Sequence, residues 1–154
     1  MRVEKDFKEF IELLNRYKVK YLVVGGFAFS YHAKARYTKD IDIWIERSEE
    51  NAKKVLEVLD AFGFSNVGLK LEDFLEEDNI VQLGYEPIRI DILMSLKGVD
   101  FDRAWENKTV GRYGDEICYY ISVENLIKNK SSTGRLIDKS DVEVLEKVKN
   151  KKVK

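Results

Sequence analysis

The sequence predicts a single α+β domain, in which a mixed β-sheet carries helices packed on its faces. Short β-rich runs alternate with segments whose apolar residues recur every three or four positions, which is typical of strands mixed with amphipathic helices. No internal repeat, low-complexity linker or shift in composition marks a second domain. A length of 154 residues suits one core, so residues 1–154 are expected to form one domain.

The first half of the chain predicts helices and strands in alternation. Phe7, Phe10 and Leu14 stand at helical spacing, whereas 21–24 is a continuous apolar run of strand length. Ser48 can cap the helix after the second strand, and Gly63 ends it. The expected elements are helix 3–17, strand 21–24, helix 27–33, a polar turn at 36–39, strand 40–45 and helix 49–62.

The second half predicts two neighbouring strands separated by Glu86 and Pro87, followed by a hairpin that turns at Gly114 and Asp115. The expected elements are short helix 71–75, strands 80–85 and 88–94, short helix 100–105, strands 109–113 and 116–121, a helix from Ser122 to about 130, a break at 131–134 and helix 141–148. The basic tail 147–154 is expected to be a frayed, solvated helix end, with an RNA-contacting arm as the alternative.

Composition narrows the class of protein. Charged residues make up 36% of the chain but almost cancel, with a formal net charge of -1, so neither a globally basic nucleic-acid binder nor DNA binding is indicated. No apolar run approaches the roughly 20 residues that span a membrane. The charged, amphipathic start does not resemble a secretory signal. The single cysteine, Cys118, rules out an internal disulfide, and a cytoplasmic location is expected.

A glycine pair, Gly25 and Gly26, closes the first strand and opens a helix. Without side chains, the backbone N–H groups there can approach a phosphate, and the helix N-terminus favours an anion. An ordinary tight turn is the alternative interpretation. No Gly-Lys-Ser/Thr follows, so this is not a Walker loop, and the further glycine of a dinucleotide fingerprint is missing.

Two acidic strands carry the predicted chemistry. Asp40 and Asp42 stand two apart on one strand, so both carboxylates point to one face while the intervening isoleucines face the core. Asp91 repeats this pattern on a later strand. If the strands are neighbours, three carboxylates meet, and such oxygen ligands favour Mg²⁺ or Mn²⁺. Asp40 and Asp42 would hold two metals and Asp91 the one that activates the acceptor hydroxyl. Solvent-facing aspartates on half-exposed strands are the alternative.

The stretch VVGGFAFSYHAKARYTKDIDIWI followed by IRIDILM resembles the minimal nucleotidyltransferases of the polymerase-β-like fold. It is similar in particular to the small proteins related to AbiEii and MNT toxin–antitoxin systems, which carry an Arg-x-Thr-x-Asp-x-Asp motif. Here Arg36 and Thr38 begin that motif. They are expected to reach phosphate or to brace the loop.

A later segment, ENLIKNKSSTGRLIDKSDVEVL, loosely resembles a second element of that family. The resemblance implies that Lys130 contacts the triphosphate and that Asp138 and Asp141 organise the edge of the site. Two departures stand out. The glycine pair lacks the serine that many relatives place there, and Leu136-Ile137 precedes Asp138 where relatives have a lysine.

The predicted function is transfer of an NMP from an NTP, with ATP as the default, to a hydroxyl on protein or RNA, with release of pyrophosphate. A cognate toxin or antitoxin is a possible partner by the same resemblance. The alternative is a non-catalytic, antitoxin-like or regulatory module that keeps the fold and binds a partner. Modification of a small molecule such as an aminoglycoside is disfavoured, because such enzymes usually carry a larger substrate-binding domain.

Further side chains have both structural and functional interpretations. His32, the only histidine, is expected to form a structural hydrogen bond rather than to act in acid–base catalysis. Trp44, Tyr119 and Tyr120 are expected in the core or at its rim, with base stacking as the alternative. Cys118 is expected to be buried and without a redox role.

Overall fold

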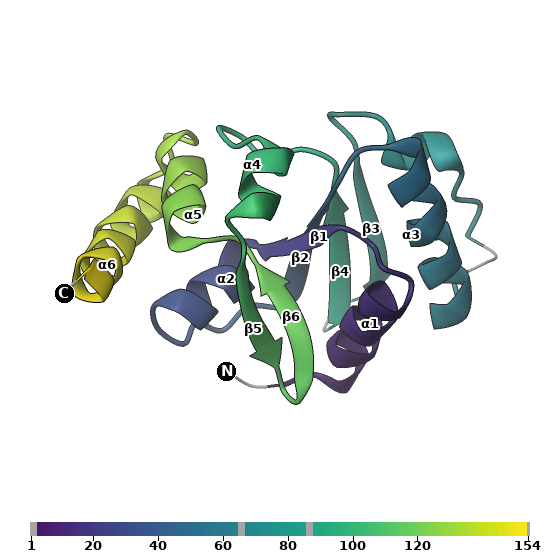
Figure 1. Cartoon of the computed structure of the whole chain (residues 1–154), viewed down its shortest axis with the longest axis horizontal. Coiled ribbons are helices and arrows are strands. Elements are labelled where there is room, and N and C mark those ends of the chain that lie inside the picture. Colours follow the sequence, from purple (N-terminus) through teal and green to yellow (C-terminus); the bar gives the residue numbers. More distant parts are fainter. Residues whose placement is uncertain (1–2, 65–66, 86–87, 154) are drawn as a thin grey trace.

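The computed structural model describes residues 3–64, 67–85 and 88–153. Its six strands form one mixed sheet in the order β3-β4-β2-β1-β6-β5 (Figure 1). Strands β2 and β4 are parallel, as are β1 and β6, and the other neighbours are antiparallel. The predicted α+β class with a mixed sheet is confirmed. The strands are β1 Tyr21–Val24, β2 Asp40–Ile45, β3 Ile80–Tyr85, β4 Ile88–Leu93, β5 Thr109–Tyr113 and β6 Glu116–Tyr120.

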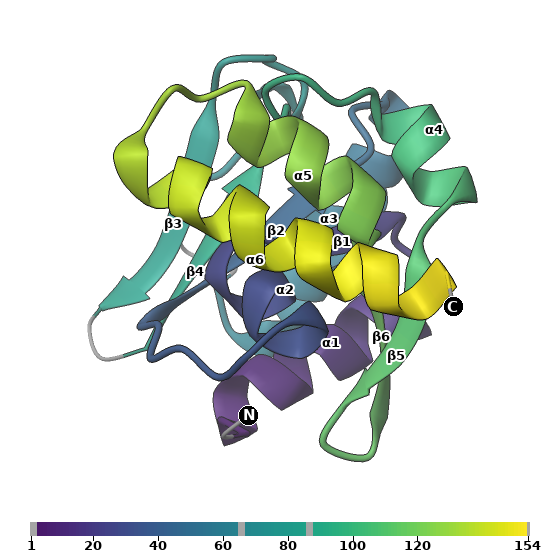
Figure 2. The same ribbon diagram turned by 90° about the vertical axis from the view of Figure 1, so that its left-hand side faces the viewer.

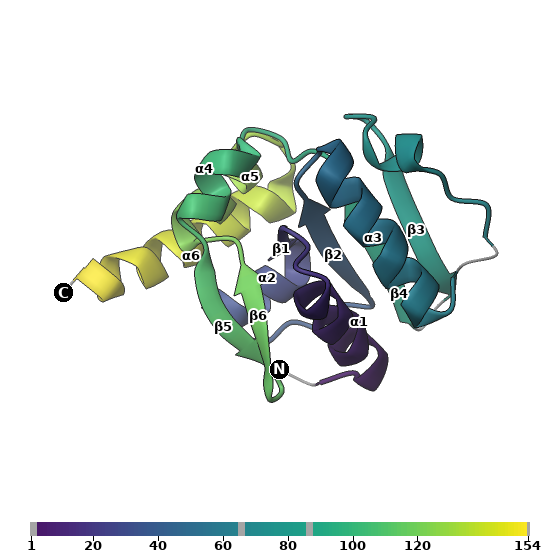
Figure 3. The same ribbon diagram turned by 45° about the vertical axis from the view of Figure 1, so that its right-hand side comes forward.

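Helices cover both faces of the sheet. Helices α1 and α3 pack side by side on one face (Figure 3), while α2, α5 and α6 gather on the other, with α6 crossing in front of α2 in Figure 2. The short helix α4 adjoins α5 (Figure 1). The helices are α1 Lys5–Arg16, α2 Gly25–His32, α3 Glu49–Phe62, the 3₁₀ helix η1 Leu71–Phe74, α4 Phe101–Glu106, α5 Val123–Ser131 and α6 Leu136–Val153.

The local rules predicted most element boundaries. Ser48 caps α3 by accepting a hydrogen bond from the backbone N–H of Asn51, and Gly63 ends that helix in the left-handed conformation. Ser122 caps α5 in the same way. The connection between β3 and β4, predicted at residues 86–87, lies outside the described residues.

Two helices begin earlier than the sequence predicts. Helix α2 starts at Gly25 rather than at residue 27, so the glycine pair forms its first turn. Helix α6 starts at Leu136 rather than at Asp141 and continues to Val153, so residues 147–153 of the basic tail form the end of this helix. Its first two turns carry Leu136 and Ile137 on the outside, 83% and 58% exposed, and bury Asp138 and Asp141. Because this inward face is acidic, apolar periodicity did not reveal it.

Strand alternation places the acidic residues where the sequence predicts them. Ile41, Ile43 and Ile45 are buried in the core, whereas Asp40 and Asp42 point to the opposite face and are half-buried. Across the parallel pair, Asp42 is in register with Asp91. The two acidic strands are therefore direct neighbours, and their carboxylates share one face of the sheet.

Within the described residues, no helix is both long enough and apolar enough to cross a membrane.

Candidate active site

The glycine turn lies directly against the acidic strand. Val24 at the end of β1 pairs with Asp42, so the first residue of α2 sits beside that carboxylate. Gly25 has φ +64°, and a Cβ added there would clash with Asp42 Oδ2. A Cβ on Gly26 would come within 3.1 Å of Thr38 Oγ1. Both glycines are therefore needed for close approach, and the N-terminus of α2 opens beside the carboxylates.

Three carboxylates gather beside this turn, as predicted. Asp42 and Asp91 are in-register neighbours on the parallel strands β2 and β4, and Asp40 lies two residues before Asp42. Asp91 is only 8% exposed. The structure thus brings Gly25, Asp40, Asp42 and Asp91 together from three separate stretches of the chain.

Arg89 is a site residue that the sequence reasoning missed. Its Nη2 donates to Asp40 Oδ2 at 2.7 Å and to Asp91 Oδ2 at 3.3 Å, and its Nε donates to Asp91 Oδ1 at 3.1 Å. The signal was present, because a residue two before Asp91 on a strand must share its face. Arg89 provides the positive charge that holds two of the three carboxylates close together.

The electrostatic cost of the cluster falls on Asp42. Burial raises its pKa most, the neighbouring charges of Asp91 and Asp40 raise it further, and Arg89 offsets only part of this, which leaves the pKa at about 7. A carboxyl in this state binds a proton near neutral pH unless a cation replaces that proton. The site therefore favours a positive charge beside Asp42 that the protein itself does not supply.

The residues fit a divalent cation in type. The three clustered side chains offer carboxylate oxygens as ligands, which Mg²⁺ and Mn²⁺ prefer. The arrangement is nevertheless not that of a finished metal site, since no group of three acidic, histidine or cysteine side chains among the described residues is placed to hold a metal ion. Arg89 takes the cationic role for Asp40 and Asp91, so Asp42 is the carboxylate whose charge a metal would chiefly neutralise.

The loop before β2 is tied to the C-terminal helix. The Arg36 guanidinium donates to both carboxylate oxygens of Asp141, at 2.8 and 2.5 Å, and its central carbon lies 4.1 Å from the Phe29 ring centroid. Thr38 donates to the Asp40 carbonyl and faces Gly26. Of the two roles predicted for Arg36 and Thr38, this geometry supports bracing of the loop.

Lys130 lies inside the same network. Its Nζ donates to Asp141 at 2.9 Å and to Asp138 at 3.3 Å, and the residue is only 7% exposed. Asp138 also accepts hydrogen bonds from Thr133 and Arg135. Asp138 and Asp141 thus organise the packing of α6 against α5 and the Arg36 loop. The triphosphate contact of Lys130 stays a prediction, and in this conformation its ammonium group is bound by carboxylates.

The remaining candidates have structural positions. The His32 Nε2–H donates to the Ile121 carbonyl at 2.7 Å in a buried position, which fits the predicted structural hydrogen bond. Tyr120 is buried and stacks on Tyr31, with ring centroids 4.0 Å apart. Cys118 is buried within β6, and burial raises the pKa of its thiol to about 12. The ring of Tyr119 lies 5.4 Å from that of Tyr21, in the rim position expected from the sequence.

Comparison with known proteins agrees with this geometry. The family model described as "Nucleotidyltransferase of unknown function (DUF6036)" matches residues 1–151. No curated protein matches the sequence significantly.

Three solved structures share the fold. The lincosamide antibiotic adenylyltransferase LnuA, solved with lincomycin bound, is 18% identical with a TM-score of 0.55, and the match covers 94% of this chain and 97% of that one. A candidate nucleotidyltransferase from Thermotoga maritima is 20% identical, with a TM-score of 0.57 and coverage of 94% and 91%. An antigenic nucleotidyltransferase-like protein from Paracoccidioides brasiliensis is 11% identical, with a TM-score of 0.54 and coverage of 95% and 76%. At these identities the structural matches establish the fold, while no finding places the chain among the AbiEii or MNT proteins.

Proposed function

The chain belongs to the DUF6036 nucleotidyltransferase family, and on this premise we propose that it transfers an NMP from an NTP to a hydroxyl acceptor and releases pyrophosphate. The observation that carries the proposal is the in-register pair of Asp42 and Asp91 beneath the glycine turn at Gly25. Phosphate-binding backbone and metal-binding carboxylates then lie next to each other, as nucleotidyl transfer requires.

In the proposed reaction, the acceptor oxygen forms a bond to the α-phosphorus of the NTP. The bond from that phosphorus to the oxygen bridging to the β-phosphate breaks, pyrophosphate leaves, and the hydroxyl proton passes to solvent. The N–H groups at Gly25 and Gly26 bind the phosphates, while Arg36 and Thr38 hold the loop in place. Asp40, Asp42 and Asp91 would hold Mg²⁺ or Mn²⁺, which supplies neutralising charge for the phosphates and acidifies the hydroxyl. Lys130 adds positive charge at the edge of the site and is proposed to reach the triphosphate if it leaves Asp138 and Asp141.

The proposed acceptors include small molecules as well as protein and RNA. The sequence disfavoured small-molecule acceptors, because enzymes that modify them usually carry a larger substrate-binding domain. The structural match, however, covers 97% of the length of a lincosamide antibiotic adenylyltransferase. That argument against small molecules is therefore removed, and a small-molecule hydroxyl stands beside the hydroxyls of protein and RNA as a proposed acceptor. ATP remains the default donor.

A non-catalytic role is the second candidate, in which the fold serves as an antitoxin-like or regulatory module. The Arg89 bridge favours the non-catalytic role, because Arg89 stabilises Asp40 and Asp91 without a metal ion. The raised pKa of Asp42 favours the enzyme, because an interaction module gains nothing from a half-buried carboxylate crowded by two others.

Label transfer separates the two candidates. Purified protein with Mg²⁺ and each α-labelled NTP is incubated with pooled protein, RNA and small-molecule acceptors. We expect labelled product and pyrophosphate from the parent chain, and none from Asp42→Asn. An interaction module would show neither product nor Mg²⁺-dependent NTP binding in calorimetry, and that pair of results would remove the enzymatic proposal.

A further inference from the structure

Arg89 lies within the acidic cluster, on β4 opposite Asp40 and two residues before Asp91. Its guanidinium donates one hydrogen bond to Asp40 at 2.7 Å and two to Asp91, at 3.1 and 3.3 Å. Alternate residues on a strand share a face, so the guanidinium and both carboxylates lie on the side of the sheet where Gly25 meets Asp42. Arg89 therefore fills the space between two of the carboxylates that the proposed reaction assigns to a metal ion.

The carboxylates cannot serve Arg89 and a divalent cation fully at the same time. Arg89 uses Oδ2 of Asp40 and both carboxylate oxygens of Asp91. A divalent cation binds through the same oxygens, where the neighbouring guanidinium would repel it. No three acidic, histidine or cysteine side chains in the described part of the chain are placed to hold a metal ion, which agrees with a cluster arranged around the arginine. A metal ion therefore has to displace Arg89.

The structure leaves Arg89 an open side through which to move. Its side chain is 30% exposed, whereas that of Asp91 is 12% exposed, so the arginine can leave while the carboxylate stays within the sheet. A displaced guanidinium needs another anion for its N–H groups, and phosphate oxygens accept the same forked donors as a carboxylate. The phosphates of an NTP bound at the glycine turn are such an anion.

We propose, resting on the proposed nucleotidyl transfer, that Arg89 is a positioning residue that exchanges its carboxylate partners for the phosphates of the NTP when the metal ion binds. Arg89 holds Asp40 and Asp91 together until the divalent cation and the nucleotide arrive, and its guanidinium then moves to the phosphates. Divalent cations alone bind weakly, because only the nucleotide offers the displaced guanidinium a new partner. The exchange thus couples binding of the metal ion to binding of the nucleotide.

Mn²⁺ binding without nucleotide tests the competition for the carboxylates. Calorimetry and the electron paramagnetic resonance signal of free Mn²⁺ measure its affinity at alkaline pH, where the carboxylates are ionised. We expect Arg89→Gln to bind Mn²⁺ at least about fivefold more tightly than the parent chain, because the competing cation is gone. Arg89→Lys keeps the charge but loses the fork, and its affinity should lie between the two. An affinity that is unchanged or lower in Arg89→Gln would overturn the proposal.

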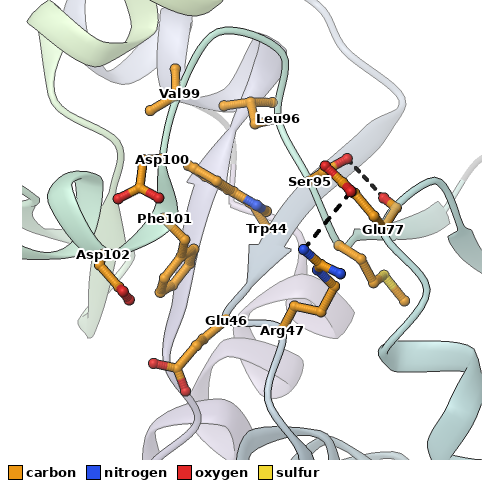
Figure 4. A pocket seen from close by; sticks show the side chains of 11 residues that line it. Trp44, Glu46, Arg47, Glu77, Ser95, Leu96, Val99, Asp100, Phe101 and Asp102 are labelled. Atoms are coloured by element: carbon orange, nitrogen blue, oxygen red, sulfur yellow. Dashed lines mark hydrogen bonds and ion pairs between the residues drawn. The ribbon is translucent and has the colours of Figure 1, made fainter.

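Arg47 provides the matched control. It follows β2 and lines a pocket that includes none of the three aspartates, and Figure 4 shows its side chain pointing toward Glu77, 4.0 Å away. Arg47→Gln removes the same charge and also breaks an ion pair, but it leaves the cluster intact. Its Mn²⁺ affinity should stay within about twofold of the parent value, because salt screens the distant charge. A gain equal to that of Arg89→Gln would assign the effect to net charge and overturn the proposal.

Nucleotide binding should change in the opposite direction. In Arg89→Gln, affinity for Mg²⁺ with an ATP analogue that cannot be cleaved should fall about fivefold or more, because the phosphates lose the guanidinium. An arginine that only holds the carboxylates in place for the metal ion would lower both affinities when it is removed. A fall in both therefore contradicts the exchange.

The parent chain gives a readout that needs no substitution. The Arg89 Nε–H donates to Asp91, so its protons should show nuclear Overhauser contacts with the Asp91 side chain. We expect Mg²⁺ with the analogue to remove these contacts, and Mg²⁺ alone at the same concentration to leave most of them. Contacts that persist at saturation with Mg²⁺ and analogue would show that the bridge stays closed and would overturn the proposal.

The failure of the premise looks different. If the analogue binds to no variant, nucleotidyl transfer and the move to the phosphates both fall, while a fivefold gain in Mn²⁺ affinity still supports the competition at the carboxylates. If the analogue binds to the parent chain and Asp42→Asn abolishes that binding, the nucleotide site stands. Equal Mn²⁺ affinities in the parent chain and Arg89→Gln would then overturn the exchange alone.

Discussion

Replacing Asp42 by Asn is expected to make the metal-free protein more stable and to abolish its response to Mg²⁺–ATP. The side chain keeps its size and gains an amide N–H₂ that can donate to the neighbouring carboxylates, and the repulsion among the three carboxylates is relieved. Residues that serve chemistry are often held at a cost in stability, so the two effects should move in opposite directions.

The magnitude follows from the pKa of Asp42, which is raised from 3.8 to about 7. A shift of that size corresponds to about 4 kcal/mol of unfavourable free energy once the group is ionised. The carboxyl is only partly buried, and water at its open side reduces the cost, so we expect a gain of about 2 kcal/mol in the substituted protein. In a chain of 154 residues this raises Tm by about 4–8 °C.

The sign of the pH dependence is fixed by the direction of the shift. Because the folded-state pKa is raised, the native state favours the protonated carboxyl, and wild-type stability falls as pH rises from about 4 through about 7. The substituted protein lacks this fall, so the difference between the two proteins should widen over that range.

Thermal and urea denaturation in EDTA, from pH 4 to pH 8, measures this difference. Asp78→Asn, an exposed position, is the control and should change stability by no more than about 0.5 kcal/mol. With Mg²⁺–ATP the wild type should gain stability and Asp42→Asn should not. A lower metal-free Tm in Asp42→Asn would refute the reasoning, because it would mean that the carboxylate stabilises the fold.

Three further predictions follow from single features of the structure. Gly25→Ala should lower the free energy of unfolding by about 1–2 kcal/mol because of its φ of +64°, and further because the new Cβ clashes with Asp42. This variant should no longer bind Mg²⁺–ATP. Gly63→Ala, whose Cβ would have no atom within 4 Å, should lose only the backbone contribution in urea titrations. For both Asp138 and Asp141, burial acts to raise the pKa but hydrogen bonds and ion pairs outweigh it, so both pKa values are lowered. The stability that these two carboxylates contribute is present above pH about 4 and is lost as pH falls through their folded-state pKa values. On acidification, the Tm of a double Asn variant should therefore fall less steeply than that of the wild type, and equal slopes would contradict this. Cys118, with its pKa raised to about 12 by burial, should react with a thiol reagent only as fast as the protein unfolds, and rapid labelling of native protein would show that the thiolate is accessible.

Local patterns anticipated the parts of the site that depend on one strand at a time. The alternation around Asp40 and Asp42 predicted which side chains leave the core, and the same rule placed Asp91. Arg89 obeyed that rule too, yet its role required knowing that β2 and β4 are parallel neighbours in a particular register. A shift by one residue would have directed Arg89 and Asp91 to the core face.

The acidic network of α6 shows a second limit. Its first two turns bury Asp138 and Asp141 and expose Leu136 and Ile137, the reverse of the usual amphipathic pattern. The carboxylates can be buried because cations from α5 and from the loop before β2 neutralise them. Those partners stand up to 105 positions away in sequence, so no local pattern could show that the aspartates face inward.

By itself, the sequence determined the α+β class, the glycine turn and the side of each strand on which the acidic residues stand. These follow from backbone geometry, which repeats every two residues in a strand and every three or four in a helix. Only the tertiary structure decided which charges meet: Asp42 with Asp91, Arg89 between the carboxylates, and Lys130 with the aspartates of α6. Electrostatic free energy depends on distance and burial in the folded chain, and neither quantity is set by position along the sequence.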